Sequence, residues 1–249
     1  MRQLLTAILL VLAGAPSALA QNCGAGTLGT SRVQSIAPGE MVGSFHYASP
    51  PFAPKEIALT FDDGPNPKST ERILDTLKRE CIRATFFVVG RRAKQAPELL
   101  RRIAAEGHTI GTHTWSHRDL KKVSPEVGKD DIEQTIDFVR TTTGRTQDAR
   151  LFRYPNLSQT PEMNRLLAEG GQIVMSTDIS PKDWKGDPPA ETLERLKRLV
   201  KNRGRGIVML HDAQAHTADF LPDFLAFLKA EGYRIVALEA AVNTPREGP

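Results

Sequence analysis

From Glu56 onward, the sequence alternates short apolar runs with longer amphipathic stretches. Alternation of this kind predicts parallel β-strands joined by helical crossovers. About seven such units follow one another, which favours a closed or nearly closed (β/α) barrel over an open doubly wound sheet. The expected strands are EIALTF (56–61), RATFFVV (83–89), HTIGT (108–112), ARLFRY (149–154), GQIVMS (171–176), GIVML (206–210) and RIVAL (234–238). The expected helices lie near residues 69–80, 95–106, 126–143, 161–169, 190–203 and 217–231.

The first 20 residues have the three parts of a secretory signal peptide. Arg2 provides the basic start, residues 4–13 form an apolar run, and Ala18-Leu19-Ala20 matches an A-x-A cleavage site. The apolar run is shorter than the roughly 20 residues that a membrane-spanning helix needs. We therefore predict cleavage after Ala20 and an exported mature chain, periplasmic or secreted, with no integral membrane segment.

The remaining chain divides by composition into three parts. Residues 21–55 contain many Gly, Ser and Pro residues and lack sustained periodicity, which predicts an irregular N-terminal extension. We expect one folded domain over residues 56–240 and a C-terminal tail over residues 241–249.

Composition and short motifs exclude several classes of protein. The 249 residues are 40% hydrophobic and 25% charged, as in an ordinary globular protein. The net charge of +4 is small, and the basic stretch RLKRLVKNRGRG (195–206) suits the carboxyl end of a solvated helix. We therefore expect no nucleic-acid binding, and no protein partner is implied. The sequence contains no G-x-S-x-G, H-E-x-x-H or C-x-x-C motif, which argues against a serine hydrolase, a zincin or a thiol redox enzyme.

The sequence has two cysteines, Cys23 and Cys81. Disulfides form and persist in exported proteins, and an even number of cysteines allows one bridge. We predict a Cys23–Cys81 disulfide that attaches the N-terminal extension to the domain.

Ionisable residues lie at the ends of several predicted strands. In a (β/α) barrel the carboxyl ends of the strands meet at one face, where the active site lies. Charged groups gathered there would repel one another or lose solvation unless they had a function. The residues concerned are Asp62 and Asp63 after the first strand, His113 after the third, Arg153 after the fourth, Asp178 after the fifth and His211 after the sixth.

The segment HTWSH, residues 113–117, places two histidines four residues apart. If the segment is helical, both imidazoles lie on one face and can reach one metal ion; a pair of hydrogen-bonded surface histidines is the alternative. A carboxylate from another strand end would complete a three-ligand site with a position open for water. Of two adjacent aspartates, one can then bind the metal while the other takes a proton from the attacking water.

Five motifs, in this order and spacing, resemble those of the polysaccharide deacetylase family, the NodB-homology domain of carbohydrate esterase family 4. They are TFDDGP (60–65), HTWSH (113–117), FRYP (152–155), DW (183–184) and MLHD (209–212), and the resemblance covers about residues 55–240. It implies a deformed (β/α) barrel that uses a divalent metal, often zinc, to remove acetyl groups from N-acetylated or, in some members, O-acetylated sugars.

The resemblance also implies roles for individual residues. Asp62 would be the general base and His211 the general acid, with Arg153 orienting the base and Asp183 orienting the acid. The metal ligands would be Asp63, His113 and His117. The implied substrate-binding residues are Tyr154, Pro155 and Asn156 of the third motif, Trp184 as a wall of the sugar site and Leu210 beside the acetyl methyl group.

The third motif departs from the pattern of many relatives. These read R-x-P-aromatic-G, whereas this chain reads Arg153-Tyr154-Pro155-Asn156-Leu157. In the family the backbone N–H of the aromatic residue helps to hold the oxyanion, and Asn156 still supplies an N–H at that position. The departure changes the shape and polarity of the acceptor site.

Together these observations predict a metal-dependent hydrolase that removes acetyl groups from N-acetylated sugars of peptidoglycan or a chitin-type glycan. Zn²⁺ is the expected metal, with Co²⁺, Ni²⁺ and Mn²⁺ as alternatives, and an acetylated glycan is the expected partner. Two other functions stay open. One is a non-catalytic domain of the same fold that binds acetylated glycan, and the other is an amide hydrolase acting on a small non-sugar substrate.

Overall fold

The computed structural model describes residues 23–24 and 26–241. The predicted signal peptide (1–20) lies outside the described residues, as does the predicted tail (241–249) except for its first residue. Within the described part, no helix is both long enough and apolar enough to span a bilayer.

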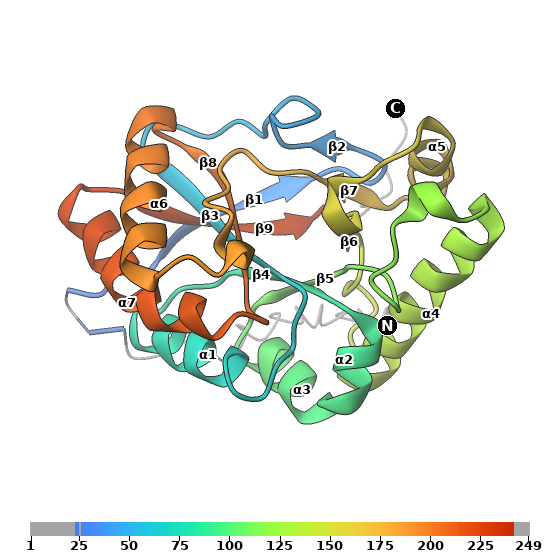
Figure 1. Ribbon diagram of the computed structural model, residues 1–249, viewed down its shortest axis with the longest axis horizontal. Helices are drawn as coiled ribbons and strands as arrows, with labels where there is room; N and C mark the ends of the chain where they lie inside the picture. Colours follow the sequence, from blue (N-terminus) through green and yellow to red (C-terminus); the bar gives the residue numbers. More distant parts are fainter. Residues whose placement is uncertain (1–22, 25, 242–249) are drawn as a thin grey trace, which may run out of the picture.

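The described residues form nine strands, seven α-helices and three short 3-10 helices (Figure 1). The strands are β1 (Thr30–Ile36), β2 (Met41–Val42), β3 (Glu56–Asp62), β4 (Thr85–Val88), β5 (Thr109–Thr112), β6 (Leu151–Phe152), β7 (Ile173–Met175), β8 (Gly206–His211) and β9 (Arg234–Ala240). The α-helices are α1 (Thr70–Arg79), α2 (Gly90–Gln95), α3 (Pro97–Ala105), α4 (Pro125–Thr143), α5 (Pro161–Glu169), α6 (Pro189–Arg203) and α7 (Ala215–Ala230). The 3-10 helices are η1 (Leu120–Lys122), η2 (Pro155–Leu157) and η3 (Asp183–Lys185).

All paired strands run parallel, which confirms the predicted α/β fold class. The sheet order is β1-β9-β3-β4-β5-β6-β7-β2, and β8 pairs with β3 outside this path. Just after β7, Ile179 forms a single parallel bridge to Val208 of β8. The strands β3 to β8 therefore make a ring that this one bridge closes, as expected of a deformed barrel.

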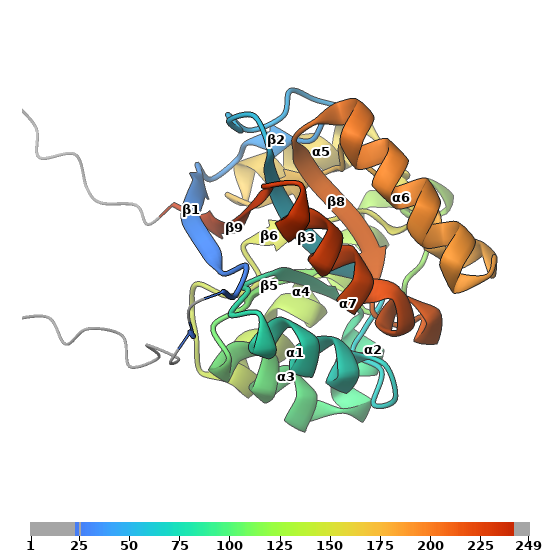
Figure 2. The same cartoon turned by 90° about the vertical axis from the view of Figure 1, so that its left-hand side faces the viewer.

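The central strands are apolar because both of their faces are covered. All seven residues of β3 and all six of β8 are buried, as in parallel sheets that have helices on the outside. The α-helices surround the strands in Figure 1, whereas β1 and β9 form a side that faces away from α6 and α7 in Figure 2. The seven predicted strands correspond to β3 to β9, and the six predicted helices to α1 and α3 to α7.

The extension over residues 21–55, predicted to be irregular, contains β1 and β2 and thus corrects that prediction. β1 pairs with β9 over its whole length, but only alternate residues are partly covered. Its sequence TSRVQSI is mostly polar, so the alternation of apolar residues that signals a strand is missing. Helix α2, GRRAKQ, was not predicted for the same reason, since Ala93 is its one buried residue beyond Gly90.

The extension is attached to the end of α1 by a disulfide and by hydrogen bonds. Cys23 and Cys81 are bonded, as predicted. Close by, Gly29 N–H donates to Glu80 O at 2.8 Å, and Leu28 N–H donates to the Glu80 carboxylate at 2.9 Å. The bridge closes a loop between positions 58 residues apart and so lowers the conformational entropy of the unfolded chain.

We expect the Cys23→Ser/Cys81→Ser variant to lose up to about 4 kcal/mol of unfolding free energy, because the unfolded chain regains the entropy of that loop. Urea unfolding of the variant and of the unreduced parent measures the difference. Thiol titration of denatured, unreduced protein should find no free thiol. Two reactive thiols per chain would show that the bridge does not form.

Candidate active site

A cavity of about 370 Å³ lies at the carboxyl ends of the barrel strands. Its volume is in the range of small-molecule sites. Residues from all five sequence motifs line it, together with the N-terminal extension. The lining residues are Phe45, Asp62, Asp63, His113, His117, Tyr154, Asn156, Leu157, Thr177, Ser180, Lys182, Trp184, Met209 and His211.

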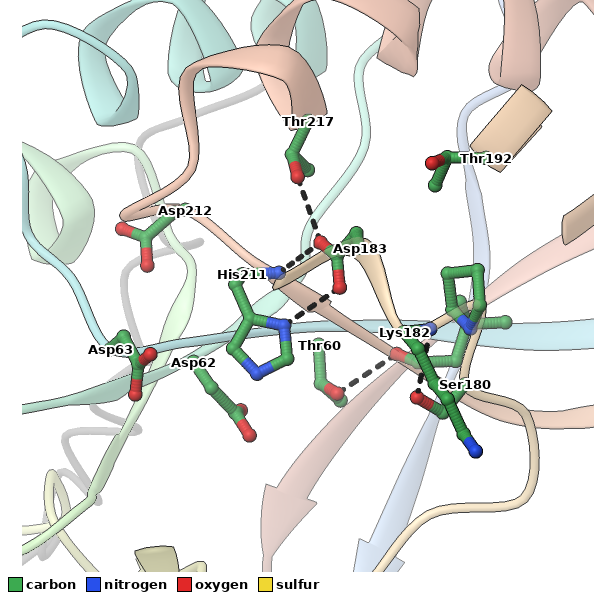
Figure 3. Close-up of polar contacts among 12 residues, drawn as sticks. Thr60, Asp62, Asp63, Ser180, Lys182, Asp183, Thr192, His211, Asp212 and Thr217 are labelled. Carbon is green, nitrogen blue, oxygen red and sulfur yellow. Dashed lines mark hydrogen bonds and ion pairs between the residues drawn. The ribbon is translucent and has the colours of Figure 1, made fainter. Parts of the chain in front are cut away.

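The two adjacent aspartates point to different partners. Asp62 is the last residue of β3, and its carboxylate accepts a hydrogen bond from Arg153 Nη1 at 2.7 Å. Asp63 has a left-handed backbone, with φ of 75°, and its carboxylate faces His113 and His117. A non-glycine residue in this region is strained, and such strain collects at functional sites. The turn at Asp63 therefore separates the two carboxylates (Figure 3).

Arg153 is fully buried and is held on every side. It donates to Thr60 Oγ1 at 2.7 Å and to the carbonyl oxygens of Met175 and Ser176, at 3.2 and 2.9 Å. Its guanidinium carbon lies 4.1 Å from the centroid of the Phe87 ring. A buried cation needs a paired anion, so Arg153 and the buried Asp62 fix each other's position.

Three side chains converge as a potential metal site. One ligand atom from each of Asp63, His113 and His117 lies within 4.8 Å of the other two. Residues 113–117 are not helical, so the shared helix face considered for the two histidines does not apply. They belong to a loop after β5 in which Thr114 and His117 both have positive φ, and this loop brings the imidazoles together.

The hydrogen bonds around these three residues fit a bound cation. His113 Nδ1 lies 2.7 Å from the carbonyl oxygen of Arg153, which can only accept, so Nδ1 carries the proton. In the neutral ring the lone pair of Nε2 then faces Asp63 Oδ1, 3.4 Å away. Asp63 Oδ1 is buried and has no hydrogen-bond partner among the described residues. Acceptors directed at one another need a positive charge between them, and two imidazoles with one carboxylate suit a zinc-type ion.

His211 ends β8 and is held by Asp183 (Figure 3). Its Nδ1 lies 2.8 Å from Asp183 Oδ1, while Asp183 Oδ2 accepts from the backbone N–H of His211 and from Thr217 Oγ1. Burial alone would lower the pKa of His211. The hydrogen bond and the charge of Asp183, with smaller contributions from Asp62 and Asp63, outweigh burial and raise that pKa to about 9.

The predicted substrate-binding residues are placed unevenly. Tyr154, Asn156 and Trp184 line the cavity, and Pro155 is buried between the first two. Leu210 does not line the cavity; it lies in the hydrophobic core, and the position predicted for it is wrong. Successive residues of a strand point to opposite faces, so Met209 shares the cavity side with His211.

Asp178 was expected at the active-site face with the other strand-end residues. Its side chain is instead buried and makes hydrogen bonds within the fold. One of its oxygens accepts from Ser44 N–H at 2.7 Å and from Ser49 Oγ at 2.5 Å. The other accepts from Ile207 N–H at 2.8 Å. The carboxylate therefore joins the N-terminal extension to β8.

Sequence reasoning did not identify Asp212, which lies directly after His211. Its buried carboxylate accepts from Gly64 N–H at 2.8 Å and from Thr70 Oγ1 at 2.6 Å. A Cβ on Gly64 would lie 1.8 Å from Asp212 Oδ2, so only glycine fits there. Burial, with the charges of Asp63 and Asp62, raises the pKa of Asp212 to about 7. The only sequence signal for Asp212 was its position directly after His211 in the motif MLHD.

Known proteins are similar to this chain in sequence and in fold. The profile described as polysaccharide deacetylase matches residues 49–173. A peptidoglycan-N-acetylglucosamine deacetylase of Bacillus cereus is 32% identical over 219 residues, which cover 86% of this chain and 78% of that protein.

Solved structures agree with the sequence comparison. A peptidoglycan deacetylase of Bdellovibrio bacteriovorus is 29% identical with a TM-score of 0.72, over 85% of this chain and 60% of that one. A pseudoenzyme of carbohydrate esterase family 4 from Bacillus anthracis is 25% identical with a TM-score of 0.66, over 74% of this chain and 63% of that one. From the matching profile and the similarity over most of its length, the chain belongs to the polysaccharide deacetylase family.

Proposed function

We propose that this protein is a metal-dependent deacetylase that hydrolyses the acetamide of N-acetylated sugars in a glycan, with peptidoglycan first and a chitin-type polymer second. The observation that carries the proposal is the set of groups around one cavity. Three charged or titratable groups line the cavity. Asp62 is paired with Arg153, Asp63 faces the imidazoles of His113 and His117, and His211 is paired with Asp183. The B. cereus relative supports an N-acetylglucosamine substrate.

Asp63, His113 and His117 would hold the ion, for which we propose zinc, with cobalt, nickel and manganese as alternatives. A bound divalent ion supplies Lewis-acid chemistry, which polarises the acetyl carbonyl and lowers the pKa of water. His113 donates through Nδ1 to the Arg153 carbonyl, and this hydrogen bond keeps its Nε2 free for ligation.

In the proposed reaction Asp62 takes the proton of the attacking water. One of its oxygens is fixed by Arg153, and the residue lines the cavity. The oxygen of the water bonds to the carbonyl carbon, and the carbon–nitrogen bond then breaks. Fixing the base in place lowers the entropy cost of reaching the transition state.

His211 acts at the leaving nitrogen. With a pKa of about 9 it is protonated at neutral pH, and Nδ1 is occupied by Asp183, so Nε2–H is the donor. Transfer of this proton releases the amine of the sugar and leaves acetate. Asn156 is proposed to supply the oxyanion donor, because it lines the cavity and its N–H has no acceptor among the described residues.

A non-catalytic glycan-binding domain is the second candidate, favoured by the similarity to the B. anthracis pseudoenzyme. The base, the acid and the three-ligand cluster argue for an enzyme, since a binding domain needs none of their pairings. Export is also proposed, from the sequence of residues 1–20 and from the disulfide, which suits an oxidising compartment.

The function is tested by measuring acetate release from peptidoglycan, from N-acetylglucosamine oligomers and from small amides, which are non-sugar acetamides. The proposal expects acetate from at least one glycan, in a reaction that a chelator stops and added zinc restores. Binding without acetate release would favour the non-catalytic domain. Turnover of the small amides alone would favour the non-sugar amide hydrolase.

Replacing a proposed ligand should empty the metal site. We expect His117→Ala to reduce metal content from about one ion per chain to near zero, because two ligands hold zinc far less tightly than three. His46→Ala is the matched control, since His46 bonds Ser176 and is not part of the cluster. Elemental analysis after dialysis measures both variants. Full metal content in His117→Ala would refute the ligand assignment.

The raised pKa of His211 sets the alkaline limit of the reaction. A raised pKa keeps the acid protonated up to about pH 9, so kcat/KM should stay high below that pH and fall as pH rises through it. Asp183→Asn removes the charge that raises this pKa, so its falling limb should lie at least about one pH unit lower.

Thr217→Val is the control for this experiment, because it removes a hydrogen bond to Asp183 and keeps the charge. Its alkaline limb should stay near that of the parent. Identical limbs in the parent and in Asp183→Asn would contradict the role of His211 as the acid.

A further inference from the structure

The two exposed apolar aromatic residues of the described chain, Phe45 and Trp184, lie at the same cavity. Four large hydrophobic side chains are exposed in the described part: Val33, Phe45, Val127 and Trp184. Phe45 is 68% exposed and Trp184 is 43% exposed, and both line the cavity that contains Asp62 and His211. A large aromatic surface left in water at a binding cavity is available to a ligand.

Phe45 comes from the N-terminal extension, outside all five sequence motifs. Its loop follows β2 and lies against residues 176–178. Phe45 N–H donates to Thr177 O at 2.9 Å, and His46 Nδ1 lies 3.0 Å from Ser176 Oγ. A Cβ on Gly43, which has φ of 109°, would lie 2.6 Å from Ser176 C, so the backbones are in close contact.

Asp178 fixes this loop at two points, Ser44 N–H and Ser49 Oγ. Its side chain is fully buried and is also bonded to β8 through Ile207 N–H. The exposed ring of Phe45 is thus carried by a backbone that is tied to the strand ending in His211. Phe has only two side-chain torsions, so a Phe ring on a fixed backbone loses little conformational entropy when a ligand covers it.

We propose that Phe45 forms a second sugar subsite, on which a neighbouring residue of the glycan chain stacks while the acetylated sugar occupies the cavity. The apolar C–H face of a pyranose suits an aromatic ring, and Phe45 offers no polar group that would require another ligand. This subsite rests on the proposed deacetylase function and adds a residue, outside the five motifs, that contacts the sugar next to the reacting one. The extension thereby contributes to substrate length selectivity.

The test compares the N-acetylglucosamine monomer with its pentamer on the full mature chain. Phe45→Ala should raise KM for the pentamer about tenfold, as for loss of a contributing aromatic anchor, with kcat nearly unchanged. KM for the monomer, which has no second sugar to place on Phe45, should not change, so the parent's preference for the pentamer should shrink about tenfold. Phe45→Tyr keeps the ring and should retain the parent's preference. Val127→Ala, which removes an exposed apolar side chain that does not line the cavity, should match the parent.

Calorimetric binding of the pentamer provides a second measurement that does not depend on turnover. If the parent releases no acetate, the deacetylase proposal fails, and about tenfold weaker pentamer binding by Phe45→Ala would still support the subsite. An active parent with equal pentamer KM in Phe45→Ala would overturn the subsite alone. Equal losses of kcat on the monomer and the pentamer would also overturn it, because they would indicate a structural role.

Discussion

The ion pair between Arg153 and Asp62 is the interaction on which the site depends. The side chain of Arg153 has no exposed surface, so its charge is stable inside the barrel only with Asp62 and three further acceptors around it. The pair joins the end of β6 to the end of β3. The same residue contacts one of the proposed metal ligands, because its carbonyl oxygen accepts from His113. One buried arginine therefore orients both the proposed base and a proposed ligand.

Two further carboxylates hold the parts of the site around this pair. Asp212 links the end of β8 to Gly64 in the turn that follows the paired aspartates. Asp183 holds His211 through both its ring and its backbone N–H. Since His211 and Asp212 are neighbours, the end of β8 holds both the proposed acid, His211, and the turn that follows the proposed base, Asp62. The distance between the proposed base and the proposed acid is thus set by the backbone, which is more rigid than side chains alone.

The sequence predicted the strands of the barrel because their burial on two faces requires continuous apolar runs, as in EIALTF and GIVML. It also predicted that the aspartates and histidines lie together, because they follow strands whose carboxyl ends meet at one face of the barrel. It did not predict β1, whose polar residues lie at an open edge, or the loop geometry of His117, which depends on positive φ values. Leu210 and Asp178 were misplaced because the direction of a side chain at a strand end depends on register and on tertiary partners. Nothing in the sequence indicated a role for Phe45, because a single aromatic residue in an irregular segment belongs to no motif or periodic pattern.

The division of roles between adjacent carboxylates is the central claim, and metal content measured together with turnover in Asp62→Asn and Asp63→Asn tests it most directly. Asp62→Asn should keep about one metal ion per chain and lose at least about a hundredfold in kcat, the lower range for a positioned general base. Asp63→Asn should lose the ion, because its carboxylate faces His113 and His117. An empty metal site in Asp62→Asn, with a filled site in Asp63→Asn, would contradict the account.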